Sequence, residues 1–303
     1  MKPRIAFLSK RSAWSTLVAP KGSRMRSLVA KGDPTVSRLR STHDAHERTL
    51  AELLSAFQDL DVEGVHIDDT AIDLHKRSNR GRGRTGFDLV VTVGGDGTLL
   101  RASHATSDVP ILGINSAPSS SVGFFCGVKG GDGVSVRRAL EQALLGKLPA
   151  SVLTRMRVTV GRKIVSERVL NDALFCHRSP AATSRYLIEV NGRSEEHKSS
   201  GFWVGPAAGS TAAQRSAGGK VLPFKSRLLQ LVVREPYTPK AEKHSLLHVL
   251  AEPGQSIVVR SKMREACLFL DGPDLAFTPD YGDVLTFEES PEPLTLLARR
   301  SKN

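Results

Sequence analysis

The sequence has few cysteines, few aromatic residues and no long apolar run, and each shortage excludes a class of protein. Its only cysteines, Cys126, Cys176 and Cys267, are too far apart for a disulfide framework or a CxxC zinc site. No apolar stretch approaches the roughly 20 residues of a membrane span. We therefore expect a protein of a reducing compartment, the cytoplasm, with no membrane partner.

Acidic residues are also scarce relative to basic ones. The 303 residues contain 31 Asp and Glu against 43 Lys and Arg, a formal net charge of +12. This excess favours anionic ligands such as phosphorylated small molecules or nucleic acid. Aromatic residues make up 5% of the chain, and none lies in the basic runs 21–40 and 76–84. Because single-stranded nucleic acids stack on aromatic platforms, we expect small anionic ligands and no nucleic-acid partner.

The first 32 residues carry eight Lys or Arg and no acid, a composition that resembles a transit peptide. The stretch "RIAFLS" (4–9) is, however, typical of a first core strand. We favour the strand and read the basic stretch 10–41 after it as a mobile surface loop.

Strand-like and helix-like patterns then alternate. A helix after Ser41 or Thr42, either of which can cap it, has Leu50, Leu53, Leu54 and Phe57 on one face. Further strands are expected at 62–68, 87–93 and 109–115, with a basic loop at 75–86 and a second helix from about Thr98. The last two strands are apolar throughout, which is typical of strands covered on both faces. The alternation predicts an α/β domain with a parallel sheet.

The pattern changes after about residue 127. A helix at 134–147 is followed by many short strand-like runs separated by Gly, Pro, Asn or charged pairs. Such a series predicts a β-rich domain. We therefore expect an α/β domain at 1–127, to which 276–303 returns, and a β-rich domain at 128–275.

The segment "LVVTVGGDGTLLRASH" (89–104) joins the buried strand to the second helix. Gly94, Gly95 and Gly97 let the backbone approach a ligand closely and expose its N–H groups. Ligands of α/β proteins bind at this end of a strand, and the next helix N-terminus favours anions. Asp96 there suits a base that accepts a proton from an attacking hydroxyl, or a magnesium ligand. Spacing alone leaves open a tight turn in which Asp96 only caps the helix.

Two further segments carry polar residues suited to a nucleotide. In "VGPAAGSTAAQRSAGGKVLP" (204–223), small and hydroxyl-bearing residues would permit close approach of a flat ring or a phosphate. In "VLNDALFCHR" (169–178), Asn171 and Asp172 offer an amide and a carboxylate for a ribose. A structural Gly/Ala-rich turn and a plain Asn-Asp turn are the respective alternatives. The histidines examined, His43, His46, His66, His75 and His104, show no metal-ligand spacing, and no metal site is expected.

Together these segments resemble the NAD kinase family in order and spacing, from about residue 87 to 290. GGDGT alone is shared with diacylglycerol and sphingosine kinases, whereas GSTA followed by SAGG is more specific to NAD kinases. "GINSAPSSSVGFFC" and "VREPYTP" look most like the branch that includes plant NADH kinases, and "FLDG" (269–272) matches a family turn.

The resemblance implies that ATP, with Mg²⁺, phosphorylates the adenosine-ribose 2′-hydroxyl of NAD⁺ or NADH. Asp96 would accept the proton, and phosphates would be held by Gly94, Gly95, Gly97 and Thr98. Contacts to the dinucleotide would come from Asn115, Asn171, Asp172, Gly209, Ser210, Thr211, Ala212, Ala213 and Ser216. The resemblance also implies a homodimer, or a tetramer built from dimers, and leaves open whether ATP or polyphosphate is the donor.

Three departures from the common family pattern bear on the redox form of the substrate. Ala213 stands where Tyr is usual, Ser200 where an acid is usual, and "NSAPSSSVGF" replaces the usual NxGxxGF. A carboxylate attracts the cationic ring of NAD⁺ but not the neutral ring of NADH. We therefore expect NADH to be used at least as efficiently as NAD⁺.

Two other functions remain as alternatives. A lipid or other small-molecule kinase could share the GGDGT loop, although GSTA and SAGG favour a dinucleotide. A non-enzymatic nucleotide- or RNA-binding protein would gain nothing from the Asp96 anion beside phosphates.

Overall fold

The structure, a computed structural model, describes residues 2–18, 23–67, 86–238 and 244–298. The chain forms two compact units: the first extends to Ser151 and includes a C-terminal segment from Thr295, and the second is Val152–Leu294. The boundary therefore lies later than residue 127. The helix expected at 134–147, observed as α4 (Ser135–Leu144), joins the first unit because its Val136 and Leu140 are buried in that unit's core.

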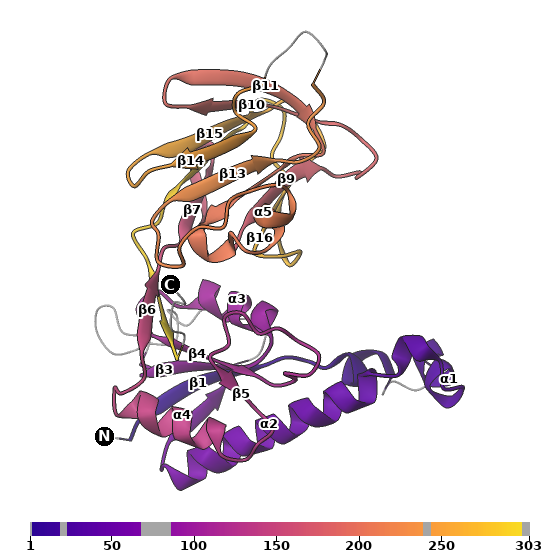
Figure 1. Cartoon of the computed structure of the whole chain (residues 1–303), viewed down its shortest axis with the longest axis vertical. Coiled ribbons are helices and arrows are strands. Elements are labelled where there is room, and N and C mark those ends of the chain that lie inside the picture. The colour runs from indigo at the N-terminus through magenta and orange to yellow at the C-terminus, as the bar shows by residue number, and fades with distance from the viewer. Residues whose placement is uncertain (1, 19–22, 68–85, 239–243, 299–303) are drawn as a thin grey trace. The chain divides into compact units, whose positions relative to one another are not determined.

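A parallel sheet forms the centre of the first unit (Figure 1), as the sequence predicts. The strand order is β2-β1-β3-β4-β19-β6, and β5 also pairs with β4. The pairings among β1 to β5, and that of β19 with β4, are parallel. The strands are β1 (Arg4–Ser9), β2 (Glu63–His66), β3 (Leu89–Gly94), β4 (Ile111–Asn115), β5 (Val128–Lys129), β6 (Ala150–Leu153) and β19 (Leu294–Leu297).

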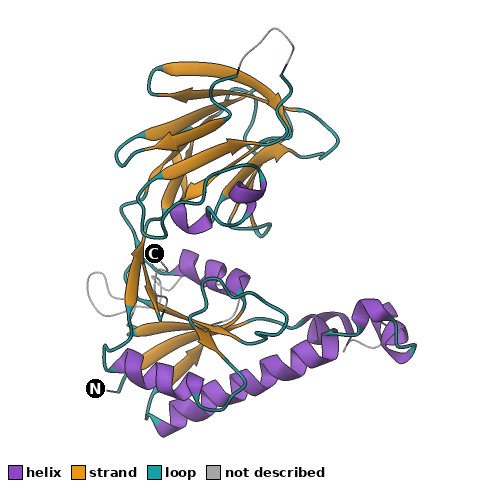
Figure 2. Ribbon diagram, in the orientation of Figure 1, coloured by secondary structure: helices purple, strands orange, loops and turns teal. Residues whose placement is uncertain are grey.

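Helices cover both faces of this sheet. Side chains of α2 (Leu39–Asp59) and α4 share a core with alternate residues of β3, namely Leu89, Val91 and Val93. The helix α3 (Asp96–Ala105) lies on the opposite face (Figures 1 and 2). Successive strand residues point to opposite faces, and helices cover both faces of the sheet. Every residue of β3 and β4 is therefore buried, which explains their uniformly apolar sequences.

The expectation of a loop at 10–41 is wrong. The described part of this stretch contains the π-helix Trp14–Val18, α1 (Arg24–Ala30), a 3₁₀ turn Pro34–Val36 and the start of α2. Ser23 accepts a hydrogen bond from the Met25 N–H at the start of α1, and Asp33 does the same for the Thr35 N–H. These residues read as helix breakers in the sequence, but they cap the short helices.

The start of α2 also differs from the expectation. The helix begins at Leu39, and its N-cap residue Arg38 makes no side-chain cap hydrogen bond, so neither Ser41 nor Thr42 caps it. The Ser41 hydroxyl donates back to the Arg38 carbonyl instead. On the predicted apolar face, Leu53 and Phe57 are buried and Leu50 is partly buried, as expected. Leu54, in contrast, is 44% exposed.

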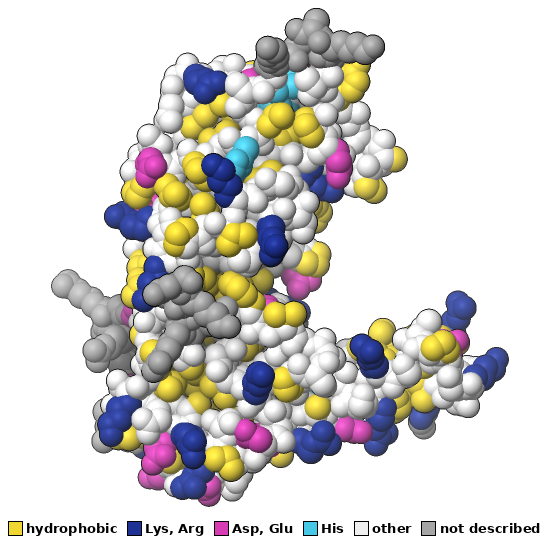
Figure 3. Space-filling model, viewed as in Figure 1, with side chains coloured by type: hydrophobic (Ala, Val, Ile, Leu, Met, Phe, Trp, Pro, Cys, Tyr) yellow, Lys and Arg dark blue, Asp and Glu magenta, His cyan; other side chains and the backbone are white. Residues whose placement is uncertain are grey.

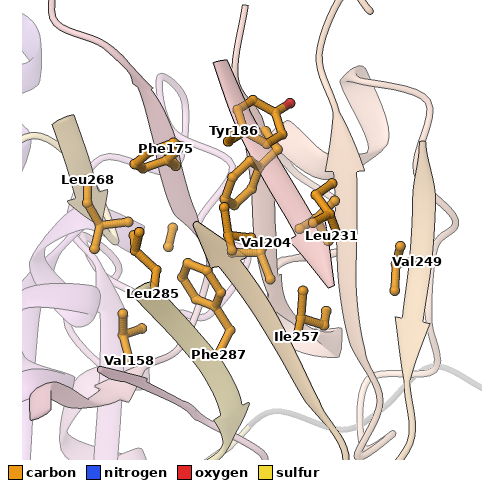
Figure 4. Close-up of a cluster of buried hydrophobic side chains, with 14 of the residues drawn as sticks. Val158, Phe175, Tyr186, Val204, Leu231, Val249, Ile257, Leu268, Leu285 and Phe287 are labelled. Carbon is orange, nitrogen blue, oxygen red and sulfur yellow. The ribbon is translucent and has the colours of Figure 1, made fainter. Parts of the chain in front are cut away.

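The second unit packs two antiparallel six-stranded sheets around one core, which confirms the β-rich prediction. Their orders are β11-β10-β15-β18-β7-β8 and β14-β13-β12-β9-β16-β17. The core side chains come from both sheets (Figure 4). The strands are β7 (Met156–Val160), β8 (Lys163–Val169), β9 (Ala173–His177), β10 (Ser184–Val190), β11 (Arg193–Ser199), β12 (Phe202–Pro206), β13 (Leu229–Val233), β14 (His248–Ala251), β15 (Ser256–Ser261), β16 (Ala266–Leu270), β17 (Leu275–Phe277) and β18 (Val284–Glu289).

Two features of this unit differ from the sequence analysis. The edge strand β11 reads "RSEEHKS" and was not anticipated, because an edge strand with one solvated face needs few apolar residues. The C-terminal return to the first unit begins at Thr295 instead of residue 276, because β17 and β18 pair within the second unit's sheets.

The remaining expectations concern loops and membranes. The basic loop expected at 75–86 lies, except for Gly86, outside the described residues. Within the described ranges, no helix combines the length and the apolar character needed to cross a membrane.

Candidate active site

The GGDGT loop connects the buried strand β3 directly to α3. Gly94 ends the strand, Gly95 is the N-cap residue, and Asp96 is the first residue of the helix, two positions before the expected start at Thr98. A Cβ on Gly94 would collide with the Thr98 side chain, so this position needs glycine for packing. A Cβ on Gly97 would meet nothing within 4 Å, so this glycine presents open backbone at the helix start. Backbone N–H groups there can bind an anion.

Asp96 ties this loop to the segment that follows β4. Its Oδ2 accepts a hydrogen bond from the Phe124 N–H at 2.8 Å, and its Oδ1 accepts one from the Phe125 N–H at 2.7 Å. A carboxylate has about four acceptor positions, so these two bonds orient the group and leave capacity for a hydroxyl donor. The side chain is half-buried. Gly95 and not Asp96 is the N-cap residue of α3, and the Asp96 carboxylate is held by the segment that follows β4.

Asn115, at the end of β4, shapes that second loop from inside. Its amide nitrogen donates to the Ser121 carbonyl at 3.0 Å, and its amide oxygen accepts from the Ala117 N–H at 3.1 Å. The next residue, Ser116, shares a 2.9 Å hydrogen bond with His46 Nδ1 of α2. Burial, with smaller contributions from nearby Lys10 and His43, lowers the pKa of His46 to about 4, so this ring is neutral near pH 7. A direct contact of Asn115 to a dinucleotide stays a prediction.

The Asn171-Asp172 pair lies in the second unit, where Asp271 fixes its backbone. Asp271 accepts hydrogen bonds from three successive backbone N–H groups, those of Leu170 (2.8 Å), Asn171 (2.7 Å) and Asp172 (3.0 Å). The Asn171 amide donates to Asp172 Oδ2 at 2.6 Å. Asp172 is 5% exposed, and burial, reinforced by the Asp271 charge, raises its pKa to about 7. The pair is therefore held by a hydrogen-bond network, which a plain turn would not need.

The loop from Gly209 to Ser216 lies against this pair. A Cβ on Gly209 would overlap the Asn171 carbonyl, so the two backbones pack in direct contact. Gln214, which is buried, also donates to the Asn171 carbonyl at 3.3 Å. The structure therefore brings together two segments that are about forty residues apart in the sequence and that the sequence analysis had read separately.

A buried polar network supports the same loop from behind. Gln230 of β13 donates to Gln214 Oε1 at 2.9 Å, and its own Oε1 accepts from the Lys220 N–H at 2.7 Å. His248 of β14 lies 2.5 Å from that same oxygen. Ser210 is fully buried, where its hydroxyl donates to the Ala207 carbonyl at 2.7 Å.

The surface of this loop is formed by its remaining residues. Thr211, Ala212 and Ser216 are exposed, and Ala213 is partly buried. Of the candidates on the loop, Gly209 and Ser210 build its interior, and these four lie where a ligand could reach them. The candidate residues of the whole chain thus form two groups, one in each unit.

Three residues of these two groups carried no functional assignment from the sequence. Asp271 lies in the "FLDG" turn that was noted without a role, and Gln230 sits in a strand that reads as apolar. Lys10 follows β1, and its N–H donates to the Val93 carbonyl at 3.0 Å, which places it beside the end of β3. The only signal for Lys10 in the sequence is its position as the first basic residue after the first strand. Elsewhere, basic and acidic side chains are interspersed over the face of the first unit seen in Figure 3.

Comparisons with known proteins identify the family of this chain. A family model described as "ATP-NAD kinase N-terminal domain" matches residues 28–142. A "Probable NADH kinase" of Oryza sativa subsp. japonica is 36% identical over 220 residues, which cover 65% of this chain and 67% of the rice protein. The "NADH kinase" of Arabidopsis thaliana is 34% identical over 225 residues, which cover 65% of this chain and 68% of that protein. This chain belongs to the NAD kinase family.

Solved structures of the NAD kinase family share its fold. An NAD kinase from Archaeoglobus fulgidus in complex with ATP has a TM-score of 0.65 at 20% identity, covering 99% of this chain and 94% of that one. Yeast NADH kinase complexed with NADH has a TM-score of 0.71 at 15% identity, covering 99% and 84%. The predicted fold class, an α/β unit with a parallel sheet followed by a β-rich unit, is confirmed for this NAD kinase family member.

Proposed function

We propose that this chain transfers the γ-phosphoryl group of ATP to the adenosine-ribose 2′-hydroxyl of NAD⁺ or NADH, giving NADP⁺ or NADPH. The observation that carries the proposal is the Asp96 carboxylate, held by two backbone N–H groups at the start of α3 with acceptor capacity to spare. Family membership and the names of the rice and Arabidopsis relatives support the substrate class.

Asp96 would act as the base. As the 2′-oxygen forms its bond to the γ-phosphorus, the bond from that phosphorus to the β,γ-bridging oxygen breaks and ADP leaves. The hydroxyl proton passes to Asp96. Positioning and charge neutralisation supply most of the rate enhancement in phosphoryl transfer. The open backbone at Gly97, the α3 N-terminus and the half-buried Lys10 are suited to hold phosphates.

Magnesium would enter with ATP as part of the substrate. Among the described residues, Asp96 belongs to no group of three side chains that could hold a cation between them. Its two oxygens already accept backbone hydrogen bonds, which suits a base better than a metal ligand. The Mg²⁺ of MgATP would neutralise charge on the transferred phosphoryl group.

The second unit would bind the dinucleotide. Asn171 and Asp172 offer an amide and a carboxyl group to ribose hydroxyls, and their backbone is fixed by Asp271. The exposed surface of Thr211, Ala212 and Ser216 is small and polar enough to lie against an adenine or a ribose. This assignment is supported by the direct contact between the two segments.

We also propose a cytoplasmic location and a homo-oligomer, a dimer or a tetramer of dimers. The location is supported by the free thiols of Cys126, Cys176 and Cys267. The assembly is supported by the family resemblance alone, and light scattering coupled to size-exclusion chromatography measures it directly.

The test of the activity is direct. The purified protein is incubated with ATP, Mg²⁺ and either NAD⁺ or NADH, and NADP(H) is measured by a coupled enzymatic assay. Parallel reactions with diacylglycerol or sphingosine test the lipid-kinase alternative. Formation of NADP(H) without lipid phosphorylation is the expected result. Lipid phosphorylation without NADP(H) overturns the proposal.

A further inference from the structure

A cluster of three ligand-type side chains lies in the second unit, outside both groups described above. Glu195 and His197 are two residues apart on the edge strand β11, so they point to the same face. His244 comes from the segment just before β14, which is the edge strand of the other sheet. The cluster thus joins the edge strand β11 to the segment that leads into β14.

The distances within the cluster are those of a shared cation. Glu195 Oε1 lies 3.0 Å from His197 Nε2 and 3.4 Å from His244 Nδ1. One ligand atom from each of the three residues lies within 4.8 Å of the others. A tetrahedral Zn²⁺ with bonds of about 2.0–2.1 Å holds its ligand atoms about 3.3 Å apart.

His197 provides an independent observation. Its ring is 1% exposed, yet in the described part of the chain neither ring nitrogen has a hydrogen-bond partner. Although Nε2 is 3.0 Å from Glu195 Oε1, the two groups do not have hydrogen-bond geometry. A cation bound at Nε2 would give this buried nitrogen a partner, because a neutral imidazole nitrogen is a metal ligand.

The carboxylate is held in place by its own partners. Ser245 donates to Glu195 Oε2 through its N–H at 2.7 Å and through its hydroxyl at 2.8 Å, and Leu246 N–H donates to Oε1 at 3.0 Å. These hydrogen bonds fix the orientation of the Glu195 carboxylate. Arg193 in turn donates to the Ser245 hydroxyl at 2.5 Å. Such outer partners are typical of ligands that are fixed for a metal.

We propose that Glu195, His197 and His244 bind one divalent transition-metal cation of the zinc class, which fastens β11 to the segment leading into β14. Two imidazoles and one carboxylate are donors that suit Zn²⁺ better than Mg²⁺ or Ca²⁺. A water molecule would complete a tetrahedral set. No metal site was expected, because His43, His46, His66, His75 and His104 show no ligand spacing. His197 and His244 are 47 residues apart, so no short motif reveals them.

The test uses tag-free protein stripped with a chelator and then dialysed against limiting Zn²⁺ or Co²⁺. We expect one equivalent of zinc by elemental analysis and a reversible rise in Tm of several degrees, since a ligand that binds only the folded state stabilises it. Co²⁺ should give the intense visible absorption of a tetrahedral site. These readouts do not depend on kinase activity, so they are separate from the test of the proposed function.

Variants locate the cation. His197→Gln and His244→Gln should each lose the bound zinc and the Tm response. His177→Gln is the matched control, because His177 lies 3.8 Å from the single carboxylate Glu265 and should leave both unchanged. The proposal is overturned if wild-type protein retains no more zinc than the His197→Gln and His244→Gln double variant, or if Co²⁺ gives no tetrahedral spectrum. The wild-type measurements decide the question even if a variant folds poorly.

Discussion

The two candidate loops are built in opposite ways. In the first unit, the proposed base is itself part of the scaffold, since Asp96 accepts hydrogen bonds from Phe124 and Phe125 and so joins two loops. In the second unit, the exposed residues Thr211, Ala212 and Ser216 of the Gly209–Ser216 loop do not join it to another loop in the described structure. Gln214 and Gln230 support that loop from the buried side. In the roles we propose, the base is held in one orientation, whereas the binding surface combines a fixed backbone with exposed side chains.

Removing the carboxylate charge should have the largest effect. Asp96→Asn keeps an acceptor for one loop N–H group but lacks a base for the 2′-hydroxyl. We expect kcat to fall about 100- to 10,000-fold, with dinucleotide binding close to wild type. The Tm should fall modestly, because one loop N–H group loses its acceptor. Steady-state kinetics measure kcat, and calorimetric titration with NADH measures dinucleotide binding. A near-normal rate with unchanged binding would show that Asp96 is not the base.

The buried carboxyl of the second unit should make stability depend on pH. Asp172 has a folded pKa of about 7, above the unfolded value of about 3.9. The folded state therefore binds more protons between these values, and its stability falls as pH rises through that window. From pH 5 to pH 8 the wild type should lose about 3 kcal/mol relative to Asp172→Asn, at about 1.4 kcal/mol per pKa unit.

Denaturant titrations at the two pH values check this expectation. Glu252→Gln, at an exposed position after β14, is the control and should show no such pH-dependent gain. An equal gain for Asp172→Asn at both pH values would mean that Asp172 is ionised throughout the range.

A paired glycine substitution contrasts the two loops directly. Gly209→Ala places a methyl group against the Asn171 carbonyl, so we expect a loss of about 1–3 kcal/mol from overpacking. Gly97→Ala meets open space and should leave the Tm nearly unchanged. If Gly97→Ala nevertheless raises the KM for ATP, the open backbone contacts phosphate. Equal thermal melts for the two variants would contradict the packing argument.

A larger side chain on the exposed surface of the Gly209–Ser216 loop should not affect folding, but it should weaken dinucleotide binding. Ala212→Trp is expected to leave the Tm nearly intact and to raise the KM for the dinucleotide at least tenfold, about 1.4 kcal/mol. Ala181→Trp, at an exposed turn before β10, is the matched control. An unchanged KM for Ala212→Trp would show that the loop lines no substrate site.

The smallest expected effect concerns the redox form of the substrate. Ser200 stands where the family usually has an acid, and the Arg234 guanidinium donates to its carbonyl at 3.3 Å. A cation there disfavours the positive ring of NAD⁺ over the neutral ring of NADH. We expect kcat/KM for NADH to be at least that for NAD⁺, a ratio that reports differential transition-state binding.

Restoring the acid sharpens this comparison. Ser200→Asp should shift the ratio toward NAD⁺, and Ser179→Asp, on an exposed turn, should not. A wild-type preference for NAD⁺ of tenfold or more, about 1.4 kcal/mol, would rule out the expected preference. A ratio unmoved by Ser200→Asp would place Ser200 away from the nicotinamide.

The sequence predicts those features of the fold that depend on residues adjacent along the chain. An apolar run followed by glycines identified β3, its loop and α3, because burial and backbone freedom are properties of adjacent residues. The sequence could not assign Gln230 to the Gly209–Ser216 loop, since Gln230 lies in a strand and contacts Gln214 from 16 residues away. Nor could it find β11, whose solvated edge needs few apolar side chains. Ser23 and Asp33 were misread because caps and turns use the same residue types.

The return of the chain at β19 affects the order in which the protein can be made. β19 pairs with β4 through Leu296 and Ile111, and β4 ends at Asn115. The ribosome must therefore complete the entire second unit, Val152–Leu294, before the first sheet can receive this strand. Domains usually fold in turn as they emerge during synthesis. Here the unit that begins first is the one that finishes last, because its sheet lacks β19 until the second unit has been synthesised.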